Sequence, residues 1–429
     1  MAGSARGGTL SVLLGRLGGV AGSLVLGQLF VGLTYIVAAR GLTPAELGVI
    51  ATCTAIGTIA CTVFDAGLNN LLVREVAAGD LTALDARAYV RTKRRLLPVM
   101  LVPTVVACLL IESNHVTGAL LGLLGAAVWE AQTANSLLRA GHRFGPAATS
   151  QIVGRGVGLV LVLVLVLIGA PELGLVIGLL ASFALEAAID RVLLGAPGTP
   201  ARTQREALPL YREGIGYGLI SLAATSQQLD TPLVALGGGA ASAGLYAAAG
   251  RLINPLSFFA NALGLVGSPW LADARRDPER LLAEERRFLR ISAVLCLAPL
   301  VAAAVGPFVI PFLLGEAYRT SAAVFVVLAL GSAVASMNQP LGIVAQNRGR
   351  QRTVALAVGI GVGIGLLATY ALGAWGGAVW AAVGFLVSQA YILVHLWLVV
   401  RGLRRDGAPS SPGSAAHPPA RPADAKHRR

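Results

Sequence analysis

Charged residues are scarce in this sequence. Asp, Glu, Lys and Arg together make up 13% of its 429 residues, and the mean hydropathy is +0.72. A soluble protein carries roughly 25% charged residues, so this deficit excludes an ordinary soluble protein. Aromatic residues are also few, at 6%.

The residue groups that metal binding and catalysis require are also lacking. The four cysteines, Cys53, Cys61, Cys108 and Cys296, lie within apolar runs and have no metal-ligand spacing, so we interpret them as buried thiols. The five histidines are scattered, and neither a phosphate-binding loop nor a nucleophile–base pair is recognisable. We therefore expect no enzymatic activity, no metal and no cofactor.

Long apolar runs are abundant instead, and runs of about 18 or more such residues are typical of membrane-spanning helices. The expected fold is an all-α polytopic membrane protein with twelve spans. These cover approximately residues 16–39, 45–72, 96–111, 116–138, 146–168, 173–194, 214–236, 241–271, 289–314, 321–345, 353–372 and 376–400.

The segments between the spans alternate in charge. Every second segment is basic, as are both chain ends, so that all but four of the 34 basic residues fall on one side. Because basic segments remain cytoplasmic, both termini are predicted to be cytoplasmic. The net charge of +13 is then a consequence of topology, and nucleic acid is not expected as a partner. The four exceptions are Arg40, Arg155, Arg251 and Arg319.

The chain divides near its middle. Residues 195–213 form the longest polar interruption there and are predicted to be a cytoplasmic linker. They would join an N-terminal six-helix bundle, residues 1–194, to a C-terminal one, residues 214–405. Residues 406–429 are rich in Pro, Ala and Ser, which predicts a disordered cytoplasmic tail.

Short motifs recur between the two halves. "LGVIA" (Leu47–Ala51) matches "AGLYA" (Ala243–Ala247), and "VGRGVGL" (Val153–Leu159) matches "VGIGVGI" (Val358–Ile364). Each pair is six spans apart, so the repeats have the same orientation and predict two parallel bundles around a central cavity. The same registers align Asp65 with Asn261 and Arg143 with Arg348.

Three longer segments carry motifs of a known family. They are "ARGLTPAELGVIA" (Ala39–Ala51), "DAGLNNLLVREVA" (Asp65–Ala77) and "LDTPLVALGGGAASAGLYAAAGRLINPL" (Leu229–Leu256). They resemble, respectively, the junction of the first two helices, the end of the second helix, and the seventh and eighth helices of Wzx-type polysaccharide flippases. Those proteins belong to the multidrug/oligosaccharidyl-lipid/polysaccharide exporter superfamily. Leu47 stands where the family usually has an aromatic residue.

The resemblance implies a function in polysaccharide biosynthesis. Such a protein would flip a polyprenyl-pyrophosphate-linked oligosaccharide from the inner to the outer leaflet of the bacterial cytoplasmic membrane by alternating access. The expected partners are the lipid-linked glycan, membrane lipid and glycan-assembly enzymes.

Charged residues within the spans point to the site. A charge at the bilayer centre costs about 2.5 to 3.5 kcal/mol, so it requires a partner or a water-filled cavity. Arg251 lies near mid-span, and Asp230 and Glu130 lie at a similar depth. Arg251 either forms an ion pair with Asp230 or binds the pyrophosphate or an acidic sugar through its guanidinium fork. Both roles are compatible if the pair opens when substrate arrives.

The remaining intramembrane polar residues divide into two predicted sets. The first set would bind substrate together with Arg251 and comprises Arg155, Arg40, Gln227, Gln228 and Asn261. For Arg40, an interfacial position fits equally well. The second would form helix–helix ion pairs or couple transport to a proton or sodium gradient: Asp230, Asp65 and Glu130. Glu186 and Asp190 are interpreted as interfacial.

Two other functions compete with flipping. A cation-coupled multidrug antiporter of the same fold would line its cavity with acids and aromatic rings, whereas this sequence offers arginines and few rings. A membrane glycan polymerase or ligase would carry catalytic residues on a large external loop, and every external loop here is short.

Overall fold

The computed structural model describes residues 26–79, 81–195, 225–274 and 277–405. Helices occupy nearly all of these residues. Most of the predicted linker, the predicted tail and the first parts of the first and seventh spans lie outside the described residues.

The N-terminal half begins with the helix Leu26–Ala39. It continues with α2 (Pro44–Asp65), α3 (Leu68–Ala78), α4 (Ala83–Arg95), α5 (Leu97–Ile111), α6 (His115–Ala140), α7 (Phe144–Leu167) and α8 (Pro171–Leu194). The C-terminal half contains η2 (Ser226–Leu229), α10 (Asp230–Ala274), α11 (Pro278–Leu295), α12 (Leu297–Leu314), η3 (Glu316–Tyr318), α13 (Arg319–Asn347) and α14 (Gln351–Arg405).

Two of these helices each contain two spans. The chain turns within α10 at Gly239, which has a φ of 84°, and within α14 at Gly376 and Gly377, the latter with a φ of 71°. The first turn lies between two predicted spans, and the second lies at the first two residues of the predicted span 376–400. With these turns counted, the described residues include at least part of each of the twelve predicted spans.

The second span differs from the prediction of one continuous helix over residues 45–72. α2 begins as expected, because Thr43 and Glu46 form a capping box. However, it ends at Asp65, because Ala66 and Gly67 adopt left-handed backbone with φ of 47° and 77°. The chain then starts α3, and the basic segment that follows it is itself helical, as α4.

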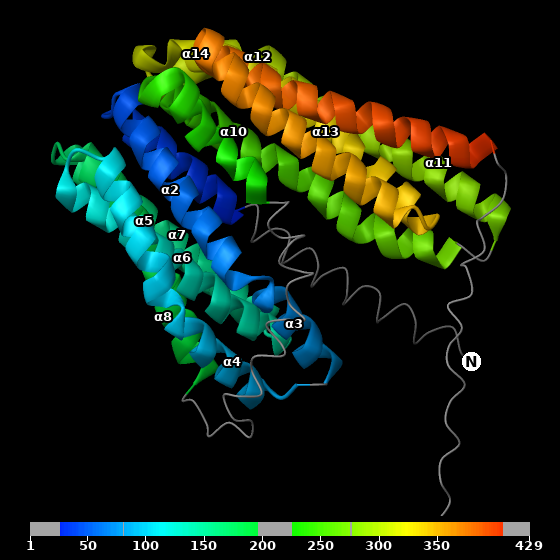
Figure 1. The fold of residues 1–429 in the computed structure, drawn as a ribbon, viewed down its shortest axis with the longest axis horizontal. Coiled ribbons are helices and arrows are strands. Elements are labelled where there is room, and N and C mark those ends of the chain that lie inside the picture. Colours follow the sequence, from blue (N-terminus) through cyan, green and yellow to red (C-terminus); the bar gives the residue numbers. More distant parts are fainter. Residues whose placement is uncertain (1–25, 80, 196–224, 275–276, 406–429) are drawn as a thin grey trace, which may run out of the picture.

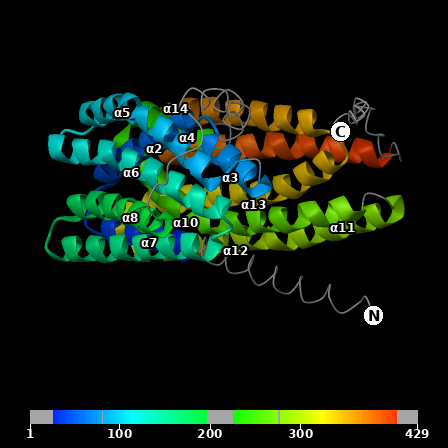
Figure 2. The ribbon, with the colours of Figure 1, turned by 90° about the horizontal axis from the view of Figure 1, so that it is seen from below.

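The turns gather at two ends of the molecule. One end, called here the charge-poor end, carries the turns at Gly41, Ser113, Gly169, Gly239 and Gly377. The opposite end, called the basic end, carries the arginine-rich segments. In Figure 1 the two halves approach each other near the charge-poor end, at the upper left, and diverge from there. Figure 2 shows α11 and the ends of α13 and α14 extending away from the N-terminal half.

The halves pack together mainly through α2 and α10. Their closest approach is at Gly48 and Gly244, the glycines that the first sequence repeat aligns. A Cβ atom on Gly48 would overlap the Ala240 carbonyl oxygen and lie 2.7 Å from the Gly244 nitrogen, and one on Gly244 would overlap the Pro44 carbonyl oxygen. Equivalent residues face each other where a twofold axis passes, so this contact lies on the pseudo-twofold axis between the repeats.

The second repeat has a different register from the predicted one. His142 and Gly349 follow equivalent helices, and both have left-handed backbone, with φ of 57° and 82°. Each is followed by an arginine whose nitrogen donates to a carbonyl five residues earlier. Arg143 therefore corresponds to Arg350, and the predicted match with Arg348 is wrong by two residues. The cause is a glycine at every second position, which lets the pattern slip by two.

In this corrected register, equivalent glycines of the two halves make equivalent packing contacts. Gly158 on α7 corresponds to Gly365 on α14. A Cβ atom on either glycine would overlap or crowd a serine of the last helix of its half, Ser182 or Ser388. Close helix packing at small residues is typical of membrane bundles, and it explains the glycines of this motif.

Candidate functional site

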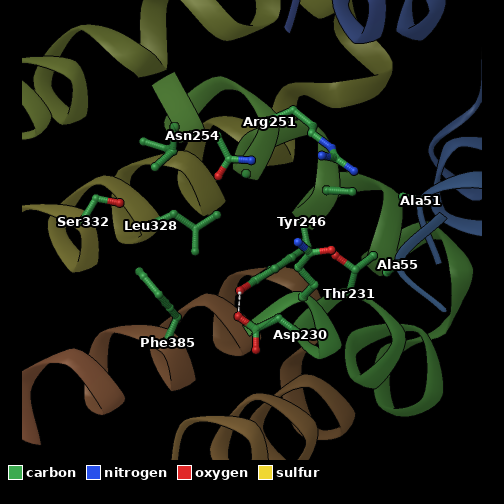
Figure 3. A pocket seen from close by; sticks show the side chains of 14 residues that line it. Ala51, Ala55, Asp230, Thr231, Tyr246, Arg251, Asn254, Leu328, Ser332 and Phe385 are labelled. Carbon is green, nitrogen blue, oxygen red and sulfur yellow. Dashed lines mark hydrogen bonds between the residues drawn. The ribbon is translucent and has the colours of Figure 1, made fainter. Parts of the chain in front are cut away.

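A cavity of about 320 Å³ lies between α2, α10, α13 and α14. This volume is at the lower end of the range for small-molecule sites. Figure 3 shows the side chains of α10 on one side of it, with Leu328 and Ser332 of α13 and Phe385 of α14 opposite. The polar residues that line it are Gln228, Asp230, Thr231, Tyr246, Arg251, Asn254 and Ser332.

Two prolines shape the backbone at this cavity. Proline has no N–H and clashes with the carbonyl four residues earlier, so Pro232 removes the helical partner of the Gln228 carbonyl. The chain there forms the 3₁₀ segment η2 instead of α-helix. Pro255 acts in the same way on the Arg251 carbonyl. The sequence thus releases backbone acceptors at two residues that line the cavity.

Arg251 lies twelve residues beyond the Gly239 turn, or about 18 Å at helical rise, and its mid-membrane depth stays a prediction. Its guanidinium carbon lies 4.7 Å from the centroid of the Tyr35 ring. Within the described part of the chain it makes no hydrogen bond or ion pair. A cation over a ring face is stabilised without using its N–H donors, so those donors remain available to a ligand in the cavity.

Asp230 has a different partner from the predicted one. Its Oδ2 accepts a hydrogen bond of 3.0 Å from the Tyr246 hydroxyl, drawn as a dashed line in Figure 3. No ion pair joins Asp230 to Arg251, although both line the same cavity. The alternative in which Arg251 is only the ion-pair partner of Asp230 is therefore wrong for this conformation, because the phenol of Tyr246 satisfies the carboxylate.

Arg155 does not line the cavity. It is buried in the N-terminal half, with its Nη2 3.3 Å from Glu186 Oε2 and its guanidinium carbon 3.7 Å from the Phe183 ring centroid. Glu186 compensates the charge of Arg155 within the N-terminal half, so Arg251 is the arginine that faces the cavity.

Glu186 and Asp190 are not interfacial, contrary to the prediction. They are 3% and 0% exposed, because α8 packs against both α6 and α7 at this point. Arg155 approaches Glu186, and the Asn135 amide donates to Asp190 Oδ2 over 3.3 Å. Their nearness to a span end in the sequence does not reveal this packing.

Arg40 lies at the charge-poor end, away from the cavity. Its Nε donates to the Leu313 carbonyl and its Nη2 to the Phe312 carbonyl, both over 3.0 Å. These are unsatisfied carbonyls at the C-terminal end of α12, where a cation is favourable. Nearby, the Tyr318 hydroxyl donates to the Leu42 carbonyl over 3.1 Å. Arg40 thus joins the two halves and does not line the cavity, and its exposed position at the end of the first span is compatible with the interfacial alternative.

Asp65 is paired with a residue that the sequence analysis did not single out. Lys93 of α4 is 2% exposed, and its Nζ lies 2.5 Å from Asp65 Oδ1. The same Nζ donates to Thr133 over 2.5 Å and to Asn69 Oδ1 over 3.1 Å. This cluster fixes α4 to α2, α3 and α6.

Glu130 is also held within the N-terminal half. It accepts hydrogen bonds from Arg94 Nε over 3.0 Å and from Arg191 Nη2 over 2.5 Å. Helix–helix pairing is thus the arrangement observed for Asp65 and Glu130, while Asp230 remains on the cavity wall.

Three residues with side-chain amides are predicted to bind substrate. Gln228 lines the cavity. Gln227 and Asn261 belong to η2 and α10, but their side chains lie outside the described part of the chain. Among the described residues, no group of three or more His, Cys, Asp or Glu could hold a metal ion.

This architecture defines a class of membrane protein. It is similar to the lipid II flippase MurJ in an inward closed conformation, with a TM-score of 0.73, 12% identity, and coverage of 89% of this chain and 87% of that one. It is also similar to a multidrug resistance MATE family transporter in its inward-facing conformation, with a TM-score of 0.68, 16% identity, and coverage of 89% and 96%. The fold is that of transporters of the multidrug/oligosaccharidyl-lipid/polysaccharide exporter (MOP) superfamily.

The family follows from the sequence itself. Residues 37–323 match the family described as polysaccharide biosynthesis protein, so the chain belongs to that family. The predicted family resemblance and the predicted all-α membrane fold are both confirmed. Comparison with curated proteins finds no match.

Proposed function

We propose that this protein flips a polyprenyl-pyrophosphate-linked oligosaccharide from the inner to the outer leaflet of the bacterial cytoplasmic membrane by alternating access. The observation that carries the proposal is Arg251, a cation on the cavity wall that forms no ion pair with any described residue and whose predicted depth is mid-membrane. A charge at this depth is costly, and an anionic ligand would offset that cost.

A pyrophosphate suits this arginine chemically. A guanidinium stays charged and binds phosphate oxygens through two parallel N–H donors. The hydrogen bond from Tyr246 stabilises the carboxylate of Asp230 in the same cavity. Membership of the polysaccharide biosynthesis family supports a glycan as the group that the pyrophosphate carries.

The arrangement of the halves supports alternating access. They are joined at the charge-poor end by Arg40, Tyr318 and the glycine contact, and they diverge toward the basic end (Figure 1). If the basic end is cytoplasmic, as its charge predicts, this conformation faces inward. The outward-facing form of the MATE transporter gives a TM-score of only 0.58, against 0.68 for its inward-facing form.

Substitution of Arg251 tests the proposal. Arg251→Ala should reduce glycan export at least about tenfold, the effect of losing one charge-assisted hydrogen bond, while the amount of protein in the membrane stays the same. Arg251→Lys should restore only part of the activity, because an ammonium lacks the bidentate fork. Export is measured as cell-surface polysaccharide in a strain that depends on this protein.

A second arginine outside the basic segments serves as the control. Arg319 is 81% exposed at the charge-poor end, so Arg319→Ala should leave export unchanged. Normal export by Arg251→Ala would contradict the proposal. A loss of export explained entirely by a lower protein level would contradict it as well.

A further inference from the structure

A second cavity of about 320 Å³ adjoins the first toward the basic end, between α13 and the two parts of α14. The two cavities share Ser332 and Phe385. We call the second cavity the amide groove. Its polar residues beyond Ser332 are Ser336, Asn338, Gln339, Gln346 and Gln389.

The lining of the amide groove contains no ionisable side chain. Its polar groups are hydroxyls and carboxamides, which both donate and accept hydrogen bonds. An ionised ligand would be desolvated there without a counter-charge, whereas a neutral ligand with many hydroxyls would find partners. The apolar remainder, including Phe385, Ile392 and Leu396, suits the C–H faces of a sugar ring.

One polar atom of the groove lacks the partner that its burial requires. Asn338 is 8% exposed, and its Nδ2 donates to both the backbone oxygen and Oε1 of Gln389 over 3.0 Å. Its Oδ1 is buried without a hydrogen-bond partner. Buried acceptors are normally satisfied, and Asn338 lines the groove, so a ligand O–H or N–H that reached this oxygen would supply the missing donor.

The backbone of α13 offers a further acceptor in the same region. Pro340 lies within α13 and cannot donate to the carbonyl of Ser336, four residues earlier. Ser336 itself lines the groove. The carbonyl of Ser336, two residues before Asn338 in the chain, therefore lacks its usual helical donor.

We infer that the amide groove binds an uncharged sugar of the lipid-linked glycan while the Arg251 cavity binds its pyrophosphate. This inference rests on the proposed function. The side chains from Ser332 to Gln346 extend over fourteen residues, or about 21 Å of helix, which leaves room for one or two sugar rings beyond the pyrophosphate. Neutral sugars, and not uronic acids, are the expected occupants.

The test compares two ligands on the purified full-length protein in detergent. One is a prenyl pyrophosphate without sugar, and the other is the same lipid carrying one N-acetylhexosamine. The wild type should bind the sugar-bearing lipid about tenfold more tightly, the equivalent of one or two good hydrogen bonds. Asn338→Leu and Gln389→Leu should each abolish that difference while changing the affinity for the sugar-free lipid less than about twofold. Gln132→Leu removes an exposed amide of α6 and should change neither affinity.

Equal affinity of the wild type for the two lipids would overturn the inference, as would groove variants that weaken both ligands alike. Thermal unfolding shows whether each variant is folded. If Asn338→Leu is not folded, Gln346→Leu, at the exposed end of the groove, replaces it as the test variant. A different result would contradict the proposed function itself: Arg251→Ala would then leave the affinity for both lipids unchanged, whatever the groove variants do.

Discussion

Lys93 shows how a single residue of a basic segment becomes part of the membrane bundle. Ala86, Tyr89, Val90 and Lys93 are all buried, and their spacing of three and four residues places them on one face of α4. The lysine therefore points the same way as the apolar residues and meets Asp65. This spacing is visible in the sequence, so the pair could have been predicted from it.

The Lys93–Asp65 pair predicts a non-additive effect on stability. Asp65→Asn should destabilise the protein by about 3 to 5 kcal/mol, because it leaves the buried Lys93 ammonium without its counter-ion. Lys93→Met should have a comparable effect by stranding the carboxylate. The double variant should recover most of the loss, since neither charge remains. Denaturation of the purified protein in detergent measures each free energy of unfolding.

The same variants decide whether Asp65 couples transport to an ion gradient. A stable double variant that still exports glycan would assign Asp65 a structural role alone. Losses that simply add in the double variant would contradict direct pairing.

The sequence predicts the distance of a charged residue from the nearest turn better than it predicts its partner. Arg251 lies twelve residues beyond the Gly239 turn, close to its expected place in the span, because helical rise converts residue number directly into distance along the helix. Its expected partner Asp230 binds Tyr246 instead, and Arg40 binds carbonyls some 273 positions away in the chain. These contacts depend on how helices rotate and cross, which a one-dimensional pattern does not specify.

At the scale of helices, apolar runs and turn residues locate the elements well. The turn at Gly239 falls between predicted spans and the turn at Gly377 falls one residue inside the start of the twelfth, and glycine permits the positive φ at both. The break after Asp65 is different, because Ala66 adopts left-handed backbone that alanine rarely occupies. Gly67, Asn69 and Asn70 give a signal for this break, but the apolar residues on both sides extend the predicted second span beyond it, so that span is too long.

The glycine contact between α2 and α10 predicts a position-specific cost. Gly48→Ala places a methyl group against the backbone of Ala240 and Gly244, so overpacking should destabilise the protein by about 1 to 3 kcal/mol. Gly156→Ala on α7 is the matched control, because a Cβ atom there meets no atom within 4 Å. That change should be neutral or stabilising by up to about 1 kcal/mol. Equal melting temperatures for the two variants would show that the helices are not in close contact at Gly48.

At the scale of the whole molecule, the alternation of charge predicts orientation. Ser113 lies exposed at the charge-poor end and Gln351 exposed at the basic end. In a Cys296→Ser background, which removes the one partly exposed cysteine, Ser113→Cys should react with a membrane-impermeant maleimide in intact cells. Gln351→Cys should react only after permeabilisation, because a basic segment remains cytoplasmic. The reverse labelling pattern would invert the topology.

The contact of Gly48 with Gly244 also provides a pivot for a rigid-body rotation of one half against the other. It lies near the charge-poor end, and α2 extends from it for a further seventeen residues to Asp65, roughly 25 Å. A rigid-body rotation of about 15°, a size known for such transitions, would displace that distal end by roughly 7 Å while the glycines hardly move. A small displacement at the pivot is thereby converted into a large opening at the basic end. Spin labels on α4 and α11 should therefore report transport as a change in distance, whereas labels beside the glycines should not.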